Sequence, residues 1–195
     1  MTHAQATVTP LENRSRLSAT DWELAALEAI AEQGVASAAV EPLARRLGVT
    51  KGSFYWHFPT REALLKAALE RWERSDEGGF PGGEPVADPR ERLRALFRLT
   101  GRDLPSHAVY SALLRALDHP IVQPVMSRVS QRRIDFLTAT FAELGLDPVA
   151  ASFRARLTYA AYAGFLQLSL QLGLPRLSHA EFDEYVEHAL STLIP

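Results

Sequence analysis

The fold is decided by one stretch, residues 43–58, which reads LARRLGVTKGSFYWHF. Leu43 and Leu47 lie one turn apart and predict a helix with an apolar edge, running from about residue 40 to residue 47. Gly48 follows where the chain must reverse, and we expect it to have a positive φ. A second short helix is predicted from residue 51 to about residue 57. The stretch therefore predicts two helices joined by a tight turn, a helix-turn-helix.

The second of these helices is expected to have two different faces. Phe54 and Phe58 lie four residues apart and are expected to turn inward as core, while Thr50 is expected to cap the helix. A short helix with a polar face fits the major groove of DNA, where it reaches base edges and phosphates. The side chains left to face solvent or DNA are those of Lys51, Gly52, Ser53, Tyr55, Trp56 and His57.

This stretch resembles the N-terminal region of the tetracycline-repressor (TetR) family of bacterial regulators. The resemblance covers about Trp22 to Trp72, and it includes the leucine-bearing segment REALL at residues 61–65. It implies a transcriptional repressor with DNA contacts from the residues of the second helix and from Thr50. It also implies a backbone phosphate contact near Arg61.

One position departs from the family pattern. Members often carry a hydroxyl residue where the helix before the turn opens, whereas this chain has Ala39 and Val40. We therefore expect no side-chain phosphate contact there. Arg45 and Arg46, on the same helix, become additional candidates for DNA contact.

The composition is that of an ordinary globular protein. Of 195 residues, 47% are apolar and 23% charged, with a net charge of −2 and no cysteine, which excludes disulfides and thiolate metal sites. No stretch approaches the roughly 20 apolar residues that span a bilayer. The first ten residues lack a secretory pattern, so we expect a cytoplasmic protein without membrane contact. Positive charge gathers in residues 41–66, which have five basic residues against two acidic ones.

Helical periodicity recurs along the chain, without a sustained alternation at period two, and predicts an all-α protein. We expect a mobile tail at 1–19, a three-helix DNA-binding domain at 20–74, a Gly/Pro-rich loop at 75–88 and a helical ligand-binding and dimerisation domain at 89–195. Thr20 or Asp21 is expected to cap the first helix, and the helix after Thr60 to reach about Arg74. Further helices are expected at about 89–100, 106–117, 120–144, 148–173 and 179–193.

The helix at about 147–173 is apolar on nearly every side, which indicates burial on more than one face. One stripe contains Ala160 and Gly164, whose small size allows another helix to approach. The TetR resemblance implies dimerisation through the last two long helices as a four-helix bundle. The expected homodimer seam consists of Phe153, Leu157, Ala160, Gly164, Leu168, Phe182, Val186, Ala189, Leu190 and Leu193.

The opposite stripe of that helix has tyrosines and is expected to face the interior of its domain. Aromatic walls with a few polar groups often line small-ligand pockets, although the same residues could equally fill a core. Arg133 either needs an anionic partner or ligand, if buried, or lies on the surface beside Arg132. The candidate pocket for a small apolar or aromatic effector consists of Phe97, Tyr110, Leu114, Leu117, Met126, Arg133, Phe136, Leu137, Tyr159, Tyr162 and Leu166.

Together these features predict a repressor that binds a palindromic double-stranded operator as a homodimer and is released by a small-molecule effector. The alternatives are an activator or a helical protein-interaction module with the same fold and little or no ligand control. No HExxH or GxSxG motif occurs, which argues against an enzyme. We expect no cofactor. A metal-linked sensor through His107, or His119 with Asp118, is a weaker alternative, because a helix-breaking Asp-His-Pro corner explains two of these residues.

Overall fold

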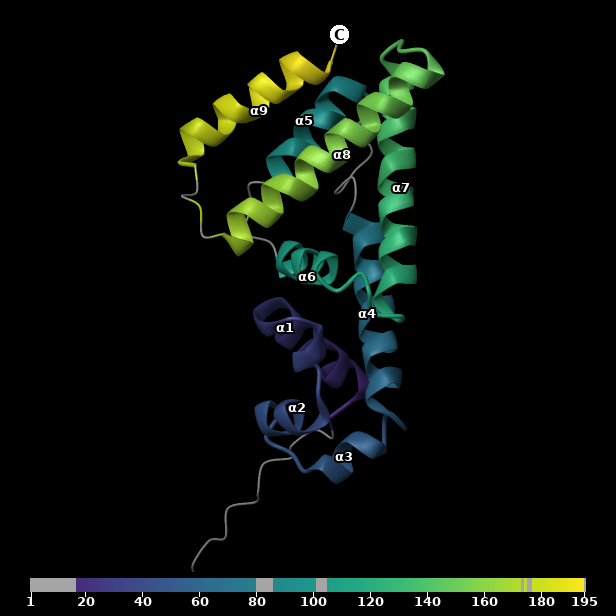
Figure 1. Cartoon of the computed structure of the whole chain (residues 1–195), viewed down its shortest axis with the longest axis vertical. Helices are drawn as coiled ribbons and strands as arrows, with labels where there is room; N and C mark the ends of the chain where they lie inside the picture. The colour runs from purple at the N-terminus through teal and green to yellow at the C-terminus, as the bar shows by residue number, and fades with distance from the viewer. Residues whose placement is uncertain (1–16, 80–85, 101–104, 173, 175–176, 195) are drawn as a thin grey trace, which may run out of the picture.

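The computed structural model describes residues 17–79, 86–100, 105–172, 174 and 177–194 (Figure 1). Within these ranges every regular element is helical, which confirms the predicted all-α class. The helix-turn-helix elements lie at one end of the long axis, and the C-terminal helices lie at the other (Figure 1). The expected tail falls almost wholly on residues 1–16, outside the described residues.

The N-terminal end consists of α1 (Ala19–Gln33), the 3-10 turn η1 (Val35–Ser37), α2 (Val40–Arg46), α3 (Lys51–Tyr55) and the start of α4 (Arg61–Gly79). The expected cap of α1 was wrong. Ser18 is the N-cap, its hydroxyl accepts a hydrogen bond from the backbone N–H of Asp21, and the Asp21 carboxylate accepts one from the backbone N–H of Ser18. This reciprocal capping box satisfies two donors that a helix start leaves without partners. The helix therefore begins at Ala19.

Helix α4 is longer than expected, since it continues past Arg74 to Gly79 and into the predicted Gly/Pro-rich loop. A glycine costs only about 1 kcal/mol in a helix relative to alanine. The helix is held upstream by buried side chains, with Trp72 2% exposed and Glu73 8% exposed. The free-energy cost of two glycines in the last turn is therefore too small to end the helix earlier. The remainder of the expected loop, residues 80–85, lies outside the described residues.

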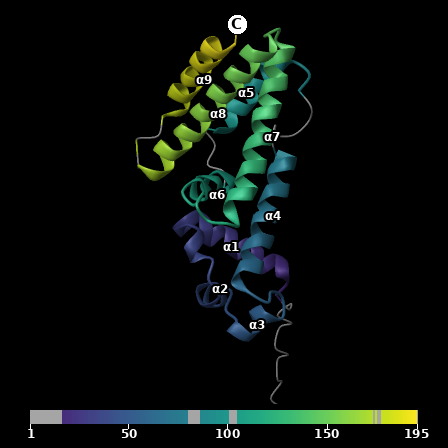
Figure 2. The same ribbon diagram turned by 45° about the vertical axis from the view of Figure 1, so that its right-hand side comes forward.

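The C-terminal end consists of α5 (Pro89–Thr100), α6 (Pro105–Leu114), α7 (Val122–Glu143), α8 (Pro148–Gln171) and α9 (His179–Leu193). Helices α7 and α8 are joined by a turn at Gly145, whose φ is 91°, and they pack together along much of their length. Helix α6 lies across the middle of the molecule, in contact with both α1 and α8 (Figure 2). It ends at Leu114, three residues earlier than the expected Leu117.

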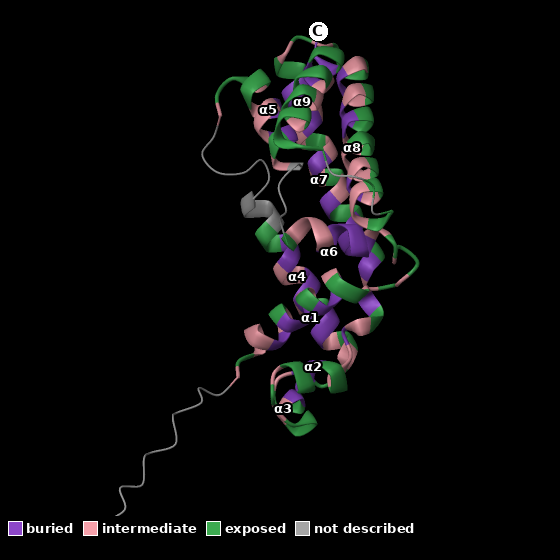
Figure 3. Cartoon of the chain, turned by 90° about the vertical axis from the view of Figure 1, so that its left-hand side faces the viewer, coloured by how far each residue is buried: buried purple, intermediate pink, exposed green. Residues whose placement is uncertain are grey.

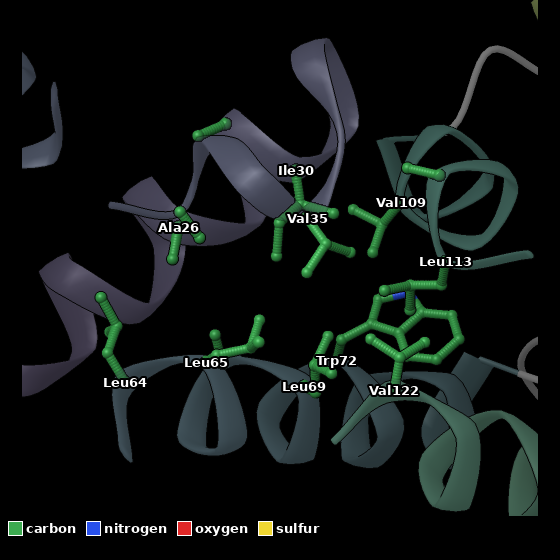
Figure 4. Close-up of a cluster of buried hydrophobic side chains, with 14 of the residues drawn as sticks. Ala26, Ile30, Val35, Leu64, Leu65, Leu69, Trp72, Val109, Leu113 and Val122 are labelled. Carbon is green, nitrogen blue, oxygen red and sulfur yellow. The ribbon is translucent and has the colours of Figure 1, made fainter. Parts of the chain in front are cut away.

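Two hydrophobic cores hold these helices together. The larger core joins the helix-turn-helix end to the C-terminal end, because Ile30 of α1, Leu69 and Trp72 of α4, Leu113 of α6 and Val122 of α7 belong to one buried cluster (Figure 4). The smaller core joins α5, α7, α8 and α9 at the far end. The two ends of the molecule thus share one close-packed apolar interior. This packing couples the positions of α6 and α7 to those of α1 and α4.

Candidate DNA-binding surface and interior cluster

The turn between α2 and α3 has the expected geometry. Gly48 has a φ of 68°, which confirms the expected positive value. The chain reverses there, and the backbone N–H of Val49 donates to the carbonyl of Ala44 at 3.0 Å. A residue with a Cβ would be strained at this φ, so the glycine is required by the backbone.

Helix α3 ends at Tyr55, two residues before the expected end at about residue 57, so Trp56 caps it and Phe58 lies in the connection to α4. Residues 54–58 bury two phenylalanines and expose the aromatic residues between them. Phe54 is 0% exposed and Phe58 is 7% exposed, which confirms their expected place in the core. The Phe54 ring packs edge-to-face on Trp22 of α1, with centroids 5.3 Å apart. Tyr55 is 63% exposed and Trp56 is 83% exposed. Exposed aromatic side chains of this size on a helix with a fixed core side indicate a contact surface.

The other candidates for DNA contact belong to α2, α3 and the residues beside them, and these two helices lie at the end of the molecule away from the C-terminus (Figure 3). Arg45, Arg46, Thr50, Lys51 and Gly52 are exposed, and Ser53, His57 and Arg61 are half-buried. Thr50 occupies the N-cap position of α3, but its side chain makes no capping hydrogen bond, so the expected side-chain cap is absent there.

Two of the cations already have carboxylate partners. Lys51 of α3 pairs with Glu41 of α2, and Arg46 pairs with Glu32 and, at 3.8 Å, with Glu28 of α1. The hydrogen bond from Lys51 holds the pKa of the Glu41 carboxyl below its ordinary value. A phosphate bound at this surface therefore has to compete with carboxylates for both cations. The sequence analysis missed these acids, because the partners lie 10 or more residues away along the chain.

The resemblance implies a phosphate contact near Arg61, but in the structure the Arg61 side chain donates hydrogen bonds to backbone carbonyls of the same chain. Its Nε donates to the carbonyl of Ala38 at 2.8 Å, and its Nη2 donates to the carbonyl of Val35 at 2.9 Å. Both acceptors belong to the segment between α1 and α2. The guanidinium therefore connects the start of α4 to the start of the helix-turn-helix.

A cluster of polar aromatic side chains occupies the interior between α6, α7 and α8. The hydroxyl of Tyr159 lies 2.6 Å from that of Tyr110 and 2.8 Å from that of Ser130. Arg133 is 4% exposed, with its guanidinium carbon 4.6 Å from the ring centroid of Tyr110 and its Nη1 3.4 Å from the Tyr162 hydroxyl. Burial raises the pKa of the Tyr110 phenol, and the neighbouring Tyr159 raises it further, so the phenol stays protonated.

Two further residues belong to this interior cluster, although they were not among the candidates. Ser130 supplies a hydroxyl from α7, one helical turn before Arg133. Trp72 of α4 stacks on Tyr110, with ring centroids 6.4 Å apart. The spacing of Ser130 from Arg133 could have identified the serine. Trp72 could not be found in this way, because its contact depends on how α4 lies against α6.

The eleven candidate pocket residues do not come together in one place. Leu114, Met126, Tyr159, Tyr162 and Leu166 pack in the larger core with Tyr110, which Arg133 contacts. Phe97, Phe136 and Leu137 pack in the smaller core, and Tyr159 packs against both cores. Leu117 is 46% exposed, since α6 ends before it. The candidates on α7 are spread along the helix axis. Leu137 follows Met126 by eleven positions, and at a rise of about 1.5 Å per residue the two side chains reach different cores.

The candidate dimer seam divides between the two last helices. On α8, Phe153 is 68% exposed, Leu157 58% and Leu168 48%, and Ala160 and Gly164 are also exposed. This stripe forms one face of α8 that the chain itself does not cover, and the expected burial of that face against a second copy stays a prediction. The α9 candidates are directed into the chain's own smaller core, where Val186, Leu190 and Leu193 are buried and Phe182 and Ala189 are half-buried. Periodicity identified their apolar face but not that the same chain covers it.

The described part of the chain lacks two other classes of feature. None of its helices has both the length and the apolar character needed to cross a membrane. No group of three or more histidine, aspartate and glutamate residues comes together there in a way that could hold a metal ion.

Comparison with known proteins places the strongest sequence similarity in the helix-turn-helix. Residues 24–68 match the model of the family described as bacterial regulatory proteins, tetR family. The HTH-type transcriptional regulator SrpR of Pseudomonas putida is 47% identical over 45 residues, 23% of this chain and 21% of that protein. The HTH-type transcriptional regulator EthR of Mycolicibacterium smegmatis is 29% identical over 114 residues, 55% of this chain and 52% of that protein. The chain thus spans about half or less of the length of these relatives.

The structural similarity covers nearly the whole chain. A transcriptional regulator from Rhodococcus sp. has a TM-score of 0.72 at 23% identity, over 91% of this chain and 94% of that one. A regulator from Saccharomonospora viridis, solved in complex with choline, has a TM-score of 0.71 at 19% identity, over 90% of this chain and 92% of that one. At these identities the likeness shows that the fold is shared.

Proposed function

We propose that this chain, which has the N-terminal segment of the tetR family of bacterial regulatory proteins and the fold of solved TetR-family regulators, is a transcriptional repressor that binds operator DNA as a homodimer. The observation that carries this proposal is the arrangement of residues 51–58, with Tyr55 and Trp56 exposed between Phe54 and Phe58 in the core. The matched proteins are transcriptional regulators and not enzymes. We place the protein in the cytoplasm, where DNA is accessible to it.

On this proposal, residues 20–74 form the DNA-binding domain and residues 89–195 the ligand-binding and dimerisation domain. Lysine and arginine bind phosphates and orient the protein, while side chains in the groove distinguish bases. The aromatic rings of Tyr55 and Trp56 present apolar edges suited to thymine methyl groups. We propose that the contact surface consists of Arg45, Arg46, Thr50, Lys51, Gly52, Ser53, Tyr55, Trp56 and His57.

The test of DNA binding is a fluorescence-anisotropy titration of the full chain against a labelled duplex from the promoter region that flanks its own gene. A scrambled duplex of the same length and composition is the matched control. Binding that is tighter for the promoter duplex and weakens steeply with salt supports the proposal, because phosphate contacts release counterions. Equal, weak binding to both duplexes contradicts it.

The exposed stripe of α8 supports a homodimer. Five of its residues are exposed, among them Phe153, Leu157 and Leu168. Apolar side chains gathered on one helix face mark an interaction surface. A second copy of the chain would bury this stripe against its own, and a two-fold dimer would present two α3 helices to a palindromic operator.

The interior cluster supports an effector site. Arg133, Tyr110, Tyr159, Tyr162 and Ser130 gather donors and aromatic faces in the interior of the C-terminal end. We propose that the effector is a small aromatic molecule with a group that accepts hydrogen bonds, placed near Arg133. An effector releases the operator only if it binds the DNA-incompetent state more tightly than the DNA-bound state.

A further inference from the structure

We infer that Arg61 is a positioning residue for DNA recognition, which fastens the helix-turn-helix to α4 and does not itself bind phosphate. The inference rests on the proposed DNA-binding function. It differs from that function because it concerns how the recognition helix is oriented and not whether the protein binds DNA.

The geometry of the Arg61 guanidinium supports this role. Nε and Nη2 lie 2.8 Å and 2.9 Å from the carbonyl oxygens of Ala38 and Val35, which stand 23 and 26 residues earlier in the chain. Both acceptor residues are buried, with exposed fractions of 0% for Ala38 and 7% for Val35. Nε and Nη2 are therefore directed into the protein and away from a duplex that would lie against α3.

The segment that contains the two acceptor carbonyls needs a hydrogen-bond donor from outside it. It is the short turn η1, and its following residue Ala38 has a φ of −71° and a ψ of 65°, outside the helical range. The carbonyl of Ala38 lies in a buried turn, and a buried carbonyl without a partner costs about 1–3 kcal/mol. A planar guanidinium satisfies two carbonyls at a fixed angle. The hydroxyl of Ser37, the last residue of η1, lies 2.7 Å from the carbonyl oxygen of Ala29 and 2.6 Å from that of Gly34, and its single proton is donated to one of them at a time.

The position of this contact explains why it matters for DNA. Helix α2 begins at Val40, two residues after Ala38, and leads through the turn at Gly48 into α3. The other end of α3 joins α4 covalently through residues 56–60. The pair α2–α3 is thus attached to α4 at both ends, once by the chain and once by Arg61. Core packing by Phe54 and Phe58 also holds the pair, and without Arg61 the angle of α3 to the groove would depend on that packing alone.

Replacement of Arg61 by lysine separates the positioning role from a phosphate contact. Lysine keeps the positive charge, so a phosphate contact would survive in Arg61→Lys. A lysine ammonium lacks the planar fork that binds both carbonyls, so the positioning contact would be weakened. Arg61→Gln removes the charge as well. Arg74→Lys is the matched control, because Arg74 is an exposed arginine of α4 outside the proposed contact surface and the same charge-conserving change is made there.

The experiment is an anisotropy titration of the full-length variants with the promoter duplex and its scrambled control at several NaCl concentrations. Each titration is run well below the melting temperature found by circular dichroism. For Arg61→Lys we expect specific affinity to fall about tenfold, on the scale of one charge-assisted hydrogen bond. Scrambled-duplex affinity and the salt slope should stay at the wild-type values. The slope should also persist in Arg61→Gln, whereas loss of a phosphate contact lowers it by about 1.

Hydrogen–deuterium exchange on the same variants gives a second readout that does not need DNA. The inference predicts faster exchange in residues 35–47 of Arg61→Lys, with unchanged exchange in residues 62–72 of α4. Wild-type binding by Arg61→Lys together with unchanged exchange in residues 35–47 would overturn it, as would a salt slope reduced by about 1 in Arg61→Gln. If wild-type protein fails to prefer the promoter duplex, the proposed function fails instead, and the exchange result still decides the role of Arg61.

Discussion

The carboxylate of Glu73 on α4 accepts two hydrogen bonds from the guanidinium of Arg128 on α7, at 2.9 Å to Nε and 2.6 Å to Nη2. Arg132 adds a second cation at 3.6 Å. Glu73 is 8% exposed, and it adjoins Trp72, which stacks on Tyr110 of the interior cluster. The helix that connects the two ends of the molecule is therefore held at consecutive residues, by an ion pair to α7 and by an aromatic contact to α6.

Replacement of Glu73 by glutamine should destabilise the protein at neutral pH by about 1 kcal/mol, because a buried carboxylate loses its charge-assisted pair with the half-exposed Arg128. The hydrogen bond from Arg128 holds the pKa of Glu73 below its ordinary value. The stability from this pair is therefore present above the unfolded-state pKa and is lost as pH falls through the lower folded-state pKa. In urea unfolding, the difference between wild type and Glu73→Gln should shrink from about pH 7 to about pH 3. A difference independent of pH would contradict this assignment.

Replacement of Glu41 by glutamine should strengthen non-specific DNA binding by a few-fold. Glu41 holds Lys51 in an exposed ion pair, and exposed pairs contribute only about 0.2–1 kcal/mol. Removal of the carboxylate makes Lys51 available to phosphate and removes a negative charge from the surface. Anisotropy with the scrambled duplex measures the effect, with Glu62→Gln, an exposed acid at the start of α4, as control. Equal affinities of Glu41→Gln and wild type would show that Lys51 does not reach phosphate.

If the proposed homodimer forms through α8, replacement of Leu157 by glutamate should convert it to a monomer. Leu157 is 58% exposed in the middle of the apolar stripe of α8, where a charge would be buried against the second copy. Leu117→Glu is the matched control, since Leu117 is 46% exposed outside that stripe. Sedimentation at micromolar concentration should give a monomer for Leu157→Glu and a dimer for the wild type and the control. A wild-type monomer would reject the proposed interface.

Replacement of Tyr159 by phenylalanine should destabilise the protein by about 1 kcal/mol, because its hydroxyl bridges those of Tyr110 and Ser130. Its ring is retained, so the packing of α8 on α6 is preserved. Urea unfolding measures the change. Tyr185→Phe, on α9 outside the cluster, is the control. A change no larger than that of the control would show that the hydroxyl bridge contributes little.

The features that could be predicted from the sequence are those set by neighbouring residues. Phe54 and Phe58 lie one turn apart, and the reversal at Gly48 requires a positive φ, so the two faces of α3 could be derived before the fold was known. Helical periodicity likewise gave the start and the end of α9.

The features that escaped prediction depend on residues that lie far apart in the chain. Glu73 meets Arg128 across 55 residues, and Arg61 reaches Val35 across 26 residues. Periodicity identifies that a helix face is apolar but does not say which element covers it. For this reason α8 and α9 looked alike in sequence, although α9 turns its stripe inward and α8 leaves its stripe exposed.

The most direct test of the central claim is whether the exposed side of α3 binds DNA. Tyr55→Ala and Lys51→Ala are titrated against the promoter duplex, with Lys66→Ala of α4, an exposed lysine on another helix, as control. We predict that each α3 variant loses about tenfold or more in affinity, as expected for one base or phosphate contact, with folding and dimer unchanged. Affinity equal to that of the wild type in both α3 variants would contradict the account.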